Sequence, residues 1–157
     1  MAIINEITLF TTAYFITFIV TTTLVVYVLH LPTFITGQTK LVQEYYYENF
    51  FKSFVLDLFL VLIYLLISQL GIYWLNANHI MTRIIIVAFT TLCISGGFYL
   101  FFTGRPLDKG SFFSKWFYAA GFRAVLYDIV LLMITYTILM IMLVKTKDRI
   151  KMVGIIA

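Results

Sequence analysis

The chain has 157 residues, of which 62% are hydrophobic and only 11% are charged. A soluble domain carries roughly 25% charged residues, so this composition excludes an ordinary water-soluble fold and indicates an integral membrane protein. The net charge of +4 is scattered over short loops and a tail, which favours contact with anionic lipid headgroups over nucleic-acid binding.

Four apolar stretches follow one another along the chain, and each reaches the length of about 20 residues that a membrane-spanning helix needs. In chain order, the predicted helices cover residues 7–31, 50–75, 80–103 and 117–144, and a basic C-terminal tail covers 145–157. Only short loops remain between them. The sequence therefore predicts an all-α fold in which residues 1–157 form a single membrane domain, a four-transmembrane-helix bundle.

The second and fourth predicted helices share a pattern when the sequence is shifted against itself. The shift aligns an aromatic residue, a base and an acid in the same order: Tyr47 on Tyr118, Lys52 on Arg123, and Asp57 on Asp128. We interpret the chain as two repeats, 7–75 and 80–144, each a helical hairpin. Because each repeat has an even number of spans, both hairpins enter from the same side and lie in parallel orientation. Both termini then lie on one side of the membrane, the tail side, opposite the loop side.

Asp57 and Asp128 are the acids within the predicted spans, about a turn inside the loop-side end. A charged side chain in a spanning helix is costly and faces protein or water. An acid and a base five residues apart on one helix are separated by roughly 140° of rotation, so each base points away from the acid of its own helix. We hypothesise crossed ion pairs between the hairpins, Lys52 with Asp128 and Arg123 with Asp57.

A thin polar stripe continues from the two acids. Tyr64 and Ser68 follow Asp57 on its helix face, and Thr135 follows Asp128. Hydroxyl groups in this position could line a file of water that conducts protons or cations, or they could join packed helices by hydrogen bonds. The stripe stops short of the tail side, which favours the second interpretation.

Aromatic residues gather before the second helix of each predicted hairpin: Tyr45, Tyr46, Tyr47, Trp116 and Tyr118. Tyrosine and tryptophan prefer the headgroup level of a bilayer, so we expect these residues at the loop-side interface. There they form either an ordinary aromatic belt or a docking platform for a partner protein.

The motifs that indicate an enzyme are missing. The two histidines, His30 and His79, fall on opposite sides of the membrane and cannot share a metal ion, and the single cysteine, Cys93, cannot form a disulfide within the chain. No phosphate-binding glycine loop, zinc-protease motif or nucleophile elbow is present. We therefore expect no enzyme activity, no cofactor and no catalytic or metal site.

The approach to the last helix carries a recognisable pattern. Trp116, then Ala120–Gly121, then Val125 with Tyr127–Asp128 opening an apolar helix, is similar to small four-span membrane proteins of large icosahedral nucleocytoplasmic DNA viruses. The similarity covers residues 112–138, and the first hairpin lacks both the tryptophan and the Tyr-Asp pair. The resemblance implies a protein of the virion internal membrane that organises the bilayer or tethers it to the capsid.

The leading interpretation of the sequence is thus a structural multi-pass membrane protein whose loop-side surface contacts neighbouring membrane or capsid proteins. Oligomerisation is left open. One alternative is a small proton or cation transporter or channel that uses Asp57 and Asp128. Another is an accessory subunit of a larger membrane complex.

Overall fold

The computed structural model describes the backbone of residues 2–156 and the side chains of residues 5–144. Within that range the secondary structure is helical and contains no strand, which confirms the predicted all-α class. In chain order the elements are α1 (Ala2–Thr22), the π-helical segment η1 (Thr23–Val28), α2 (Leu31–Thr36), α3 (Thr39–Val42), the π-helical segment η2 (Gln43–Glu48), α4 (Phe50–Trp74), α5 (Ile80–Thr103), α6 (Phe112–Ala120) and α7 (Phe122–Ile156).

Four helical stretches of the described chain are long and apolar enough to cross a bilayer. They are Asn5–Val28, Phe50–Trp74, Ile80–Thr103 and Phe122–Val144. Their outward faces carry large apolar side chains that would be costly in water: Phe59 is 58% exposed, Ile85 63% and Phe89 65%. The chain is therefore a multi-pass membrane protein, as its composition predicted.

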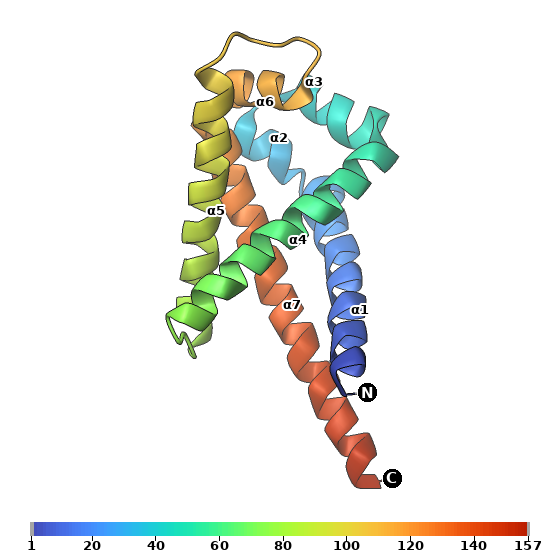
Figure 1. Ribbon diagram of the computed structural model, residues 1–157. Helices are drawn as coiled ribbons and strands as arrows, with labels where there is room; N and C mark the ends of the chain where they lie inside the picture. The colour runs from blue at the N-terminus through green and yellow to red at the C-terminus, as the bar shows by residue number, and fades with distance from the viewer. Residues whose placement is uncertain (1, 157) are drawn as a thin grey trace.

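The spanning helices are arranged as a crossed bundle (Figure 1). α1 and α5 lie on opposite sides, and α4 and α7 run obliquely between them and cross. α5 packs along α7, α4 packs against α5, and α1 packs against α7. Both chain ends lie at the same end of the bundle, the tail side.

The two predicted hairpins differ in how closely their helices pack. α5 and α7 form the most extensive backbone packing in the bundle, whereas α1 and α4 meet mainly through long side chains. The Tyr14 hydroxyl donates to the Leu58 carbonyl at 2.5 Å, and the rings of Phe18 and Phe54 lie 5.2 Å apart. The internal repeat therefore stays a prediction.

The loop side is covered by short helices that lie across the bundle. We call α2, α3, η2 and α6 the loop-side layer. His30 adopts a left-handed conformation that ends the first span, and Pro32 then lies in the first turn of α2, where its missing N–H is not needed. The connections that the sequence suggested to be short loops are thus largely helical.

The predicted fourth helix is divided at Gly121. α6 begins where the Ser111 hydroxyl accepts a hydrogen bond from the Ser114 N–H, and it ends at Gly121, whose φ of 61° and ψ of −139° suit glycine alone. α7 starts at the next residue and continues as a helix to Ile156, through most of the segment predicted as a basic tail. The side chains of that tail lie outside the described residues.

The break at Gly121 makes a prediction about stability. A Cβ at this position would meet no atom within 4 Å, so Gly121→Ala adds backbone strain without a clash and should lower the free energy of unfolding by about 1–3 kcal/mol. Gly97→Ala is the matched control, because it also has open space and lies inside α5, where alanine is the better helix former by up to about 1 kcal/mol. Reversible unfolding in detergent micelles measures both. Equal effects of the two substitutions would contradict the assigned conformation.

Candidate functional site

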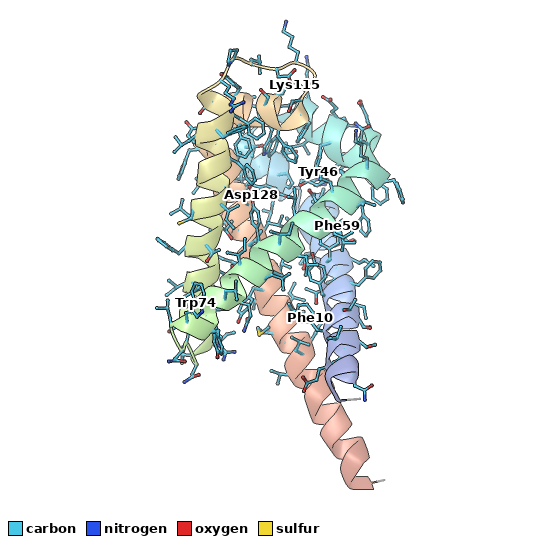
Figure 2. All side chains as sticks on the ribbon, in the orientation of Figure 1. Phe10, Tyr46, Phe59, Trp74, Lys115 and Asp128 are labelled. Carbon is cyan, nitrogen blue, oxygen red and sulfur yellow. The ribbon has the colours of Figure 1, made fainter. Side chains whose placement is uncertain are left out.

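The two intramembrane acids line one cavity on the loop side of the bundle. This loop-side cavity has a volume of about 130 Å³ and is enclosed by α4, α5, α6, α7 and η2. Asp57 enters it from the second turn of α4 and Asp128 from the second turn of α7. Figure 2 shows Tyr46 and Asp128 in the loop-side half of the bundle and Phe10 toward the tail side. The acids thus face protein and not lipid, as the cost of charge in a bilayer predicted.

The walls of the loop-side cavity are mostly aromatic. Ten of its sixteen lining residues are Phe, Tyr or Trp, and the two aspartates are the charged ones. The roof comes from the loop-side layer: Tyr45 stacks on Phe112 with ring centroids 4.3 Å apart, and Phe112 stacks in turn on Trp116 at 5.7 Å. The cavity therefore offers two carboxyl groups and aromatic faces, and its lining contains no lysine, arginine or histidine.

Asp57 is held by a tyrosine of the roof. The Tyr45 hydroxyl donates to Asp57 Oδ1 at 2.5 Å. Burial, together with the nearby Asp57 carboxylate, raises the pKa of the Tyr45 phenol above its ordinary value, so Tyr45 stays protonated and remains a donor. Beside it, the Tyr46 and Tyr127 hydroxyls lie 2.9 Å apart, and burial likewise raises the pKa of Tyr46.

Asp128 is held by a serine from the neighbouring helix. Ser95 of α5 donates to Asp128 Oδ2 at 2.7 Å, and its oxygen lies 3.1 Å from the Tyr64 hydroxyl of α4. Because a hydroxyl has one proton, Ser95 accepts from Tyr64 when it donates to Asp128. One chain of hydrogen bonds therefore joins α4, α5 and α7 beneath the cavity.

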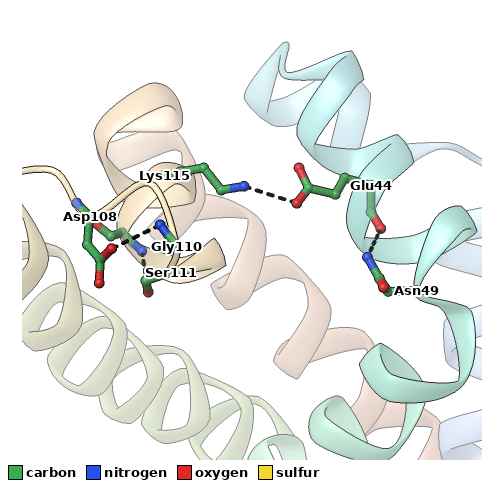
Figure 3. Close-up of polar contacts among 7 residues, drawn as sticks. Glu44, Asn49, Asp108, Gly110, Ser111 and Lys115 are labelled. Carbon is green, nitrogen blue, oxygen red and sulfur yellow. Dashed lines mark hydrogen bonds and ion pairs between the residues drawn. The ribbon is translucent and has the colours of Figure 1, made fainter.

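The hypothesis of crossed ion pairs is wrong. Lys52 and Arg123 are exposed, and the ion pair found among side chains 5–144 joins Lys115 of α6 to Glu44 of η2 at 3.0 Å (Figure 3). Taking a base into the bundle would strip its hydration, whereas Lys52 and Arg123 are exposed near the loop-side ends of α4 and α7 and keep theirs. The two acids are therefore stabilised by hydroxyl donors, and not by the predicted bases.

The polar stripe does not lead through the membrane. Ser68 donates to the Tyr64 carbonyl at 2.8 Å, and Thr135 donates to the Leu131 carbonyl at 2.7 Å, each within its own helix. Such local bonds satisfy a hydroxyl without a partner helix. Of the predicted stripe, Tyr64 alone forms a hydrogen bond across helices, and the hydroxyls of Ser68 and Thr135 bond within their own helices.

The predicted docking platform is mostly internal. Tyr45, Tyr46 and Trp116 are 8%, 6% and 6% exposed, whereas Tyr47 and Tyr118 are 41% and 40% exposed. The segments that carry them fold as amphipathic helices of the loop-side layer and turn their aromatic faces onto the bundle. A spacing of three to four residues between the aromatics was the available signal, and it would have identified the cavity roof.

Two cavity features escaped the sequence reasoning. No sequence pattern singled out Ser95 as a candidate site residue, and Tyr127 entered only through the resemblance, although both are hydrogen-bonded beside the acids. No group of three or more His, Cys, Asp or Glu side chains within the described residues could hold a metal ion. Comparison with protein-family models, curated proteins and solved structures finds no match to this chain.

The bond between Tyr45 and Asp57 can be tested by removing one hydroxyl. Tyr45→Phe leaves the ring stacking in place and deprives the carboxylate of its donor, so the free energy of unfolding should fall by about 1–3 kcal/mol. Tyr47→Phe is the matched control, because Tyr47 is exposed and its hydroxyl makes only a long contact of 3.5 Å with His30. Unfolding in detergent micelles compares them. Equal stability of both variants would show that Asp57 does not need this donor.

Proposed function

We propose that this protein is a small membrane carrier that binds a cation in the loop-side cavity. The observation that carries the proposal is that Asp57 and Asp128 line one cavity inside the spanning part of the bundle and pair with no base among side chains 5–144. Ionisable groups are costly within a membrane and mark binding or transport sites there. Two carboxylates that share a cavity attract a positive charge between them.

The walls of the cavity favour a weakly hydrated cation. A hard metal ion such as calcium takes about six to eight oxygen ligands, whereas this cavity combines two carboxylates with ten aromatic side chains. Aromatic faces attract organic ammonium groups. The volume of about 130 Å³ is close to the roughly 150 Å³ of an apolar cavity that admits benzene. A small organic ammonium ion therefore suits both size and chemistry.

The packing below the cavity favours a carrier over an open channel. Leu65 and Leu132 are 5% and 2% exposed, and Ser68 and Thr135 are 0% and 1% exposed. These side chains fill the bundle between the loop-side cavity and a second pocket nearer the tail side. A cation that leaves toward the tail side then requires α4 or α7 to move.

Uptake into liposomes tests the proposal. Reconstituted protein should take up tetramethylammonium, and Asp57→Asn and Asp128→Asn should each lower uptake by roughly tenfold, because each removes a charged interaction with the ligand. Glu48→Gln is the matched control, since Glu48 is exposed in η2 and lies outside the cavity. Uptake and equilibrium binding that both survive the aspartate substitutions would defeat the proposal.

A scaffold role is the second candidate, and the exposed loop-side surface favours it. Five bases are exposed there against two exposed acids, Glu48 and Asp108; the bases are Lys40, Lys52, Arg105, Lys109 and Arg123. This basic surface suits an acidic neighbouring protein. If the viral resemblance holds, that neighbour is a capsid component. If the chain is an accessory subunit, the neighbour is another subunit of a larger membrane complex.

Copurification in mild detergent separates this candidate from the carrier. If the basic surface holds an acidic partner, Lys40→Glu together with Lys52→Glu should release it, because the two introduced glutamates repel the partner's acidic groups. Asp57→Asn should leave the same partner bound, since Asp57 lies in the cavity. Loss of cation uptake without any change in copurifying proteins would speak for the carrier alone.

A further inference from the structure

A second hollow, the tail-side pocket, lies between α1, α4, α5 and α7 at the other end of the bundle. It has a volume of about 520 Å³, within the range of roughly 300–1,000 Å³ typical of ligand pockets. Its polar lining residues are Gln69, Arg83 and Tyr136, and its other lining residues are apolar. None of these residues lines the loop-side cavity, so the cation site does not account for this pocket.

Tyr136 is the first indication of a ligand. Its side chain is 3% exposed, and its hydroxyl has no hydrogen-bond partner among the described residues. Buried polar groups in native proteins are nearly always paired, and an unpaired hydroxyl is costly. Arg83 is the base beside this hydroxyl and interacts with it, but the contact between them falls short of normal hydrogen-bond geometry. The hydroxyl and the guanidinium can both donate to one acceptor placed between them.

Arg83 is the second indication, because no acid among the described side chains forms an ion pair with it. Its Nε donates to the Ala77 carbonyl at 2.8 Å, which fixes the side chain at the start of α5. Among side chains 5–144, no hydrogen bond of normal geometry uses the other four N–H groups of the guanidinium. No acid lines the pocket, and Arg83 takes part in no ion pair among side chains 5–144. A partly buried arginine at the edge of a spanning helix pairs well with phosphate or carboxylate oxygens.

The rest of the pocket suits an acyl chain. Leu66 and Val144 line it and are 51% and 58% exposed, so the pocket is open at residues that face the hydrocarbon of the bilayer. We propose that the tail-side pocket binds an anionic lipid, whose headgroup oxygens accept from Arg83 and Tyr136 and whose chain lies along the apolar wall. The shared chemistry is an anionic oxygen group on an acyl chain, a phospholipid phosphate or a fatty-acid carboxylate.

Native mass spectrometry of the full chain, released from mild detergent, tests the proposal. With phosphatidylglycerol and phosphatidylcholine supplied in equal amounts, the wild-type protein should retain phosphatidylglycerol preferentially. Arg83→Gln should lower that retention by roughly tenfold, and Tyr136→Phe by a few-fold. Arg105→Gln is the matched control, because Arg105 is exposed on the loop side and outside the pocket, and it should change nothing.

Competition experiments distinguish which anionic group the pocket binds. Oleate that displaces phosphatidylglycerol would support the site and assign it to a fatty acid. Inorganic phosphate that displaces it equally well would overturn the acyl-chain contact. Because Arg83 also holds the Ala77 carbonyl, Arg83→Gln could disturb the turn between α4 and α5, whereas Tyr136→Phe leaves that bond intact. The proposal would be overturned if the wild-type protein bound both lipids equally. It would also be overturned if Tyr136→Phe retained phosphatidylglycerol as well as the wild type does. Cation uptake is expected to persist in both variants.

Discussion

Within a bilayer no water is available to solvate a charged group, so each intramembrane acid must find its hydrogen bonds inside the protein. This constraint explains why a hydroxyl donor lies beside each of Asp57 and Asp128. Tyr45 reaches down from the loop-side layer to Asp57, and Ser95 reaches across from α5 to Asp128. Because both donors are neutral hydroxyls, neither acid depends on a base among side chains 5–144.

The loop-side layer has a larger role than connecting the spans. Its aromatic faces close the cavity from above, and the ion pair between Lys115 and Glu44 joins its two halves across the bundle. That pair is partly exposed and contributes little stability by itself. Its position matters more, because α6 and η2 must stay together for Tyr45 to hold Asp57.

The two hollows of the bundle have opposite electrostatic character. Acids line the loop-side cavity, and Arg83 lines the tail-side pocket. α4 and α7 contribute successive turns to both, with Tyr64 facing the cavity and Leu65 the pocket. A change in how these helices cross therefore alters both sites at once.

Composition and span length alone determined that this chain is a membrane protein, that it crosses the bilayer four times and that Asp57 and Asp128 face away from lipid. These properties follow from the free energy of transferring apolar and charged side chains from water to the bilayer, which does not depend on which helices pack together. Only the tertiary structure decided that Tyr45 and Ser95 hold the acids while Lys52 and Arg123 stay outside. α4 and α7 are apolar on nearly every face, so their sequences contain little information about rotation or crossing. The rotation and the crossing of these helices determine which side chains donate hydrogen bonds to the two acids.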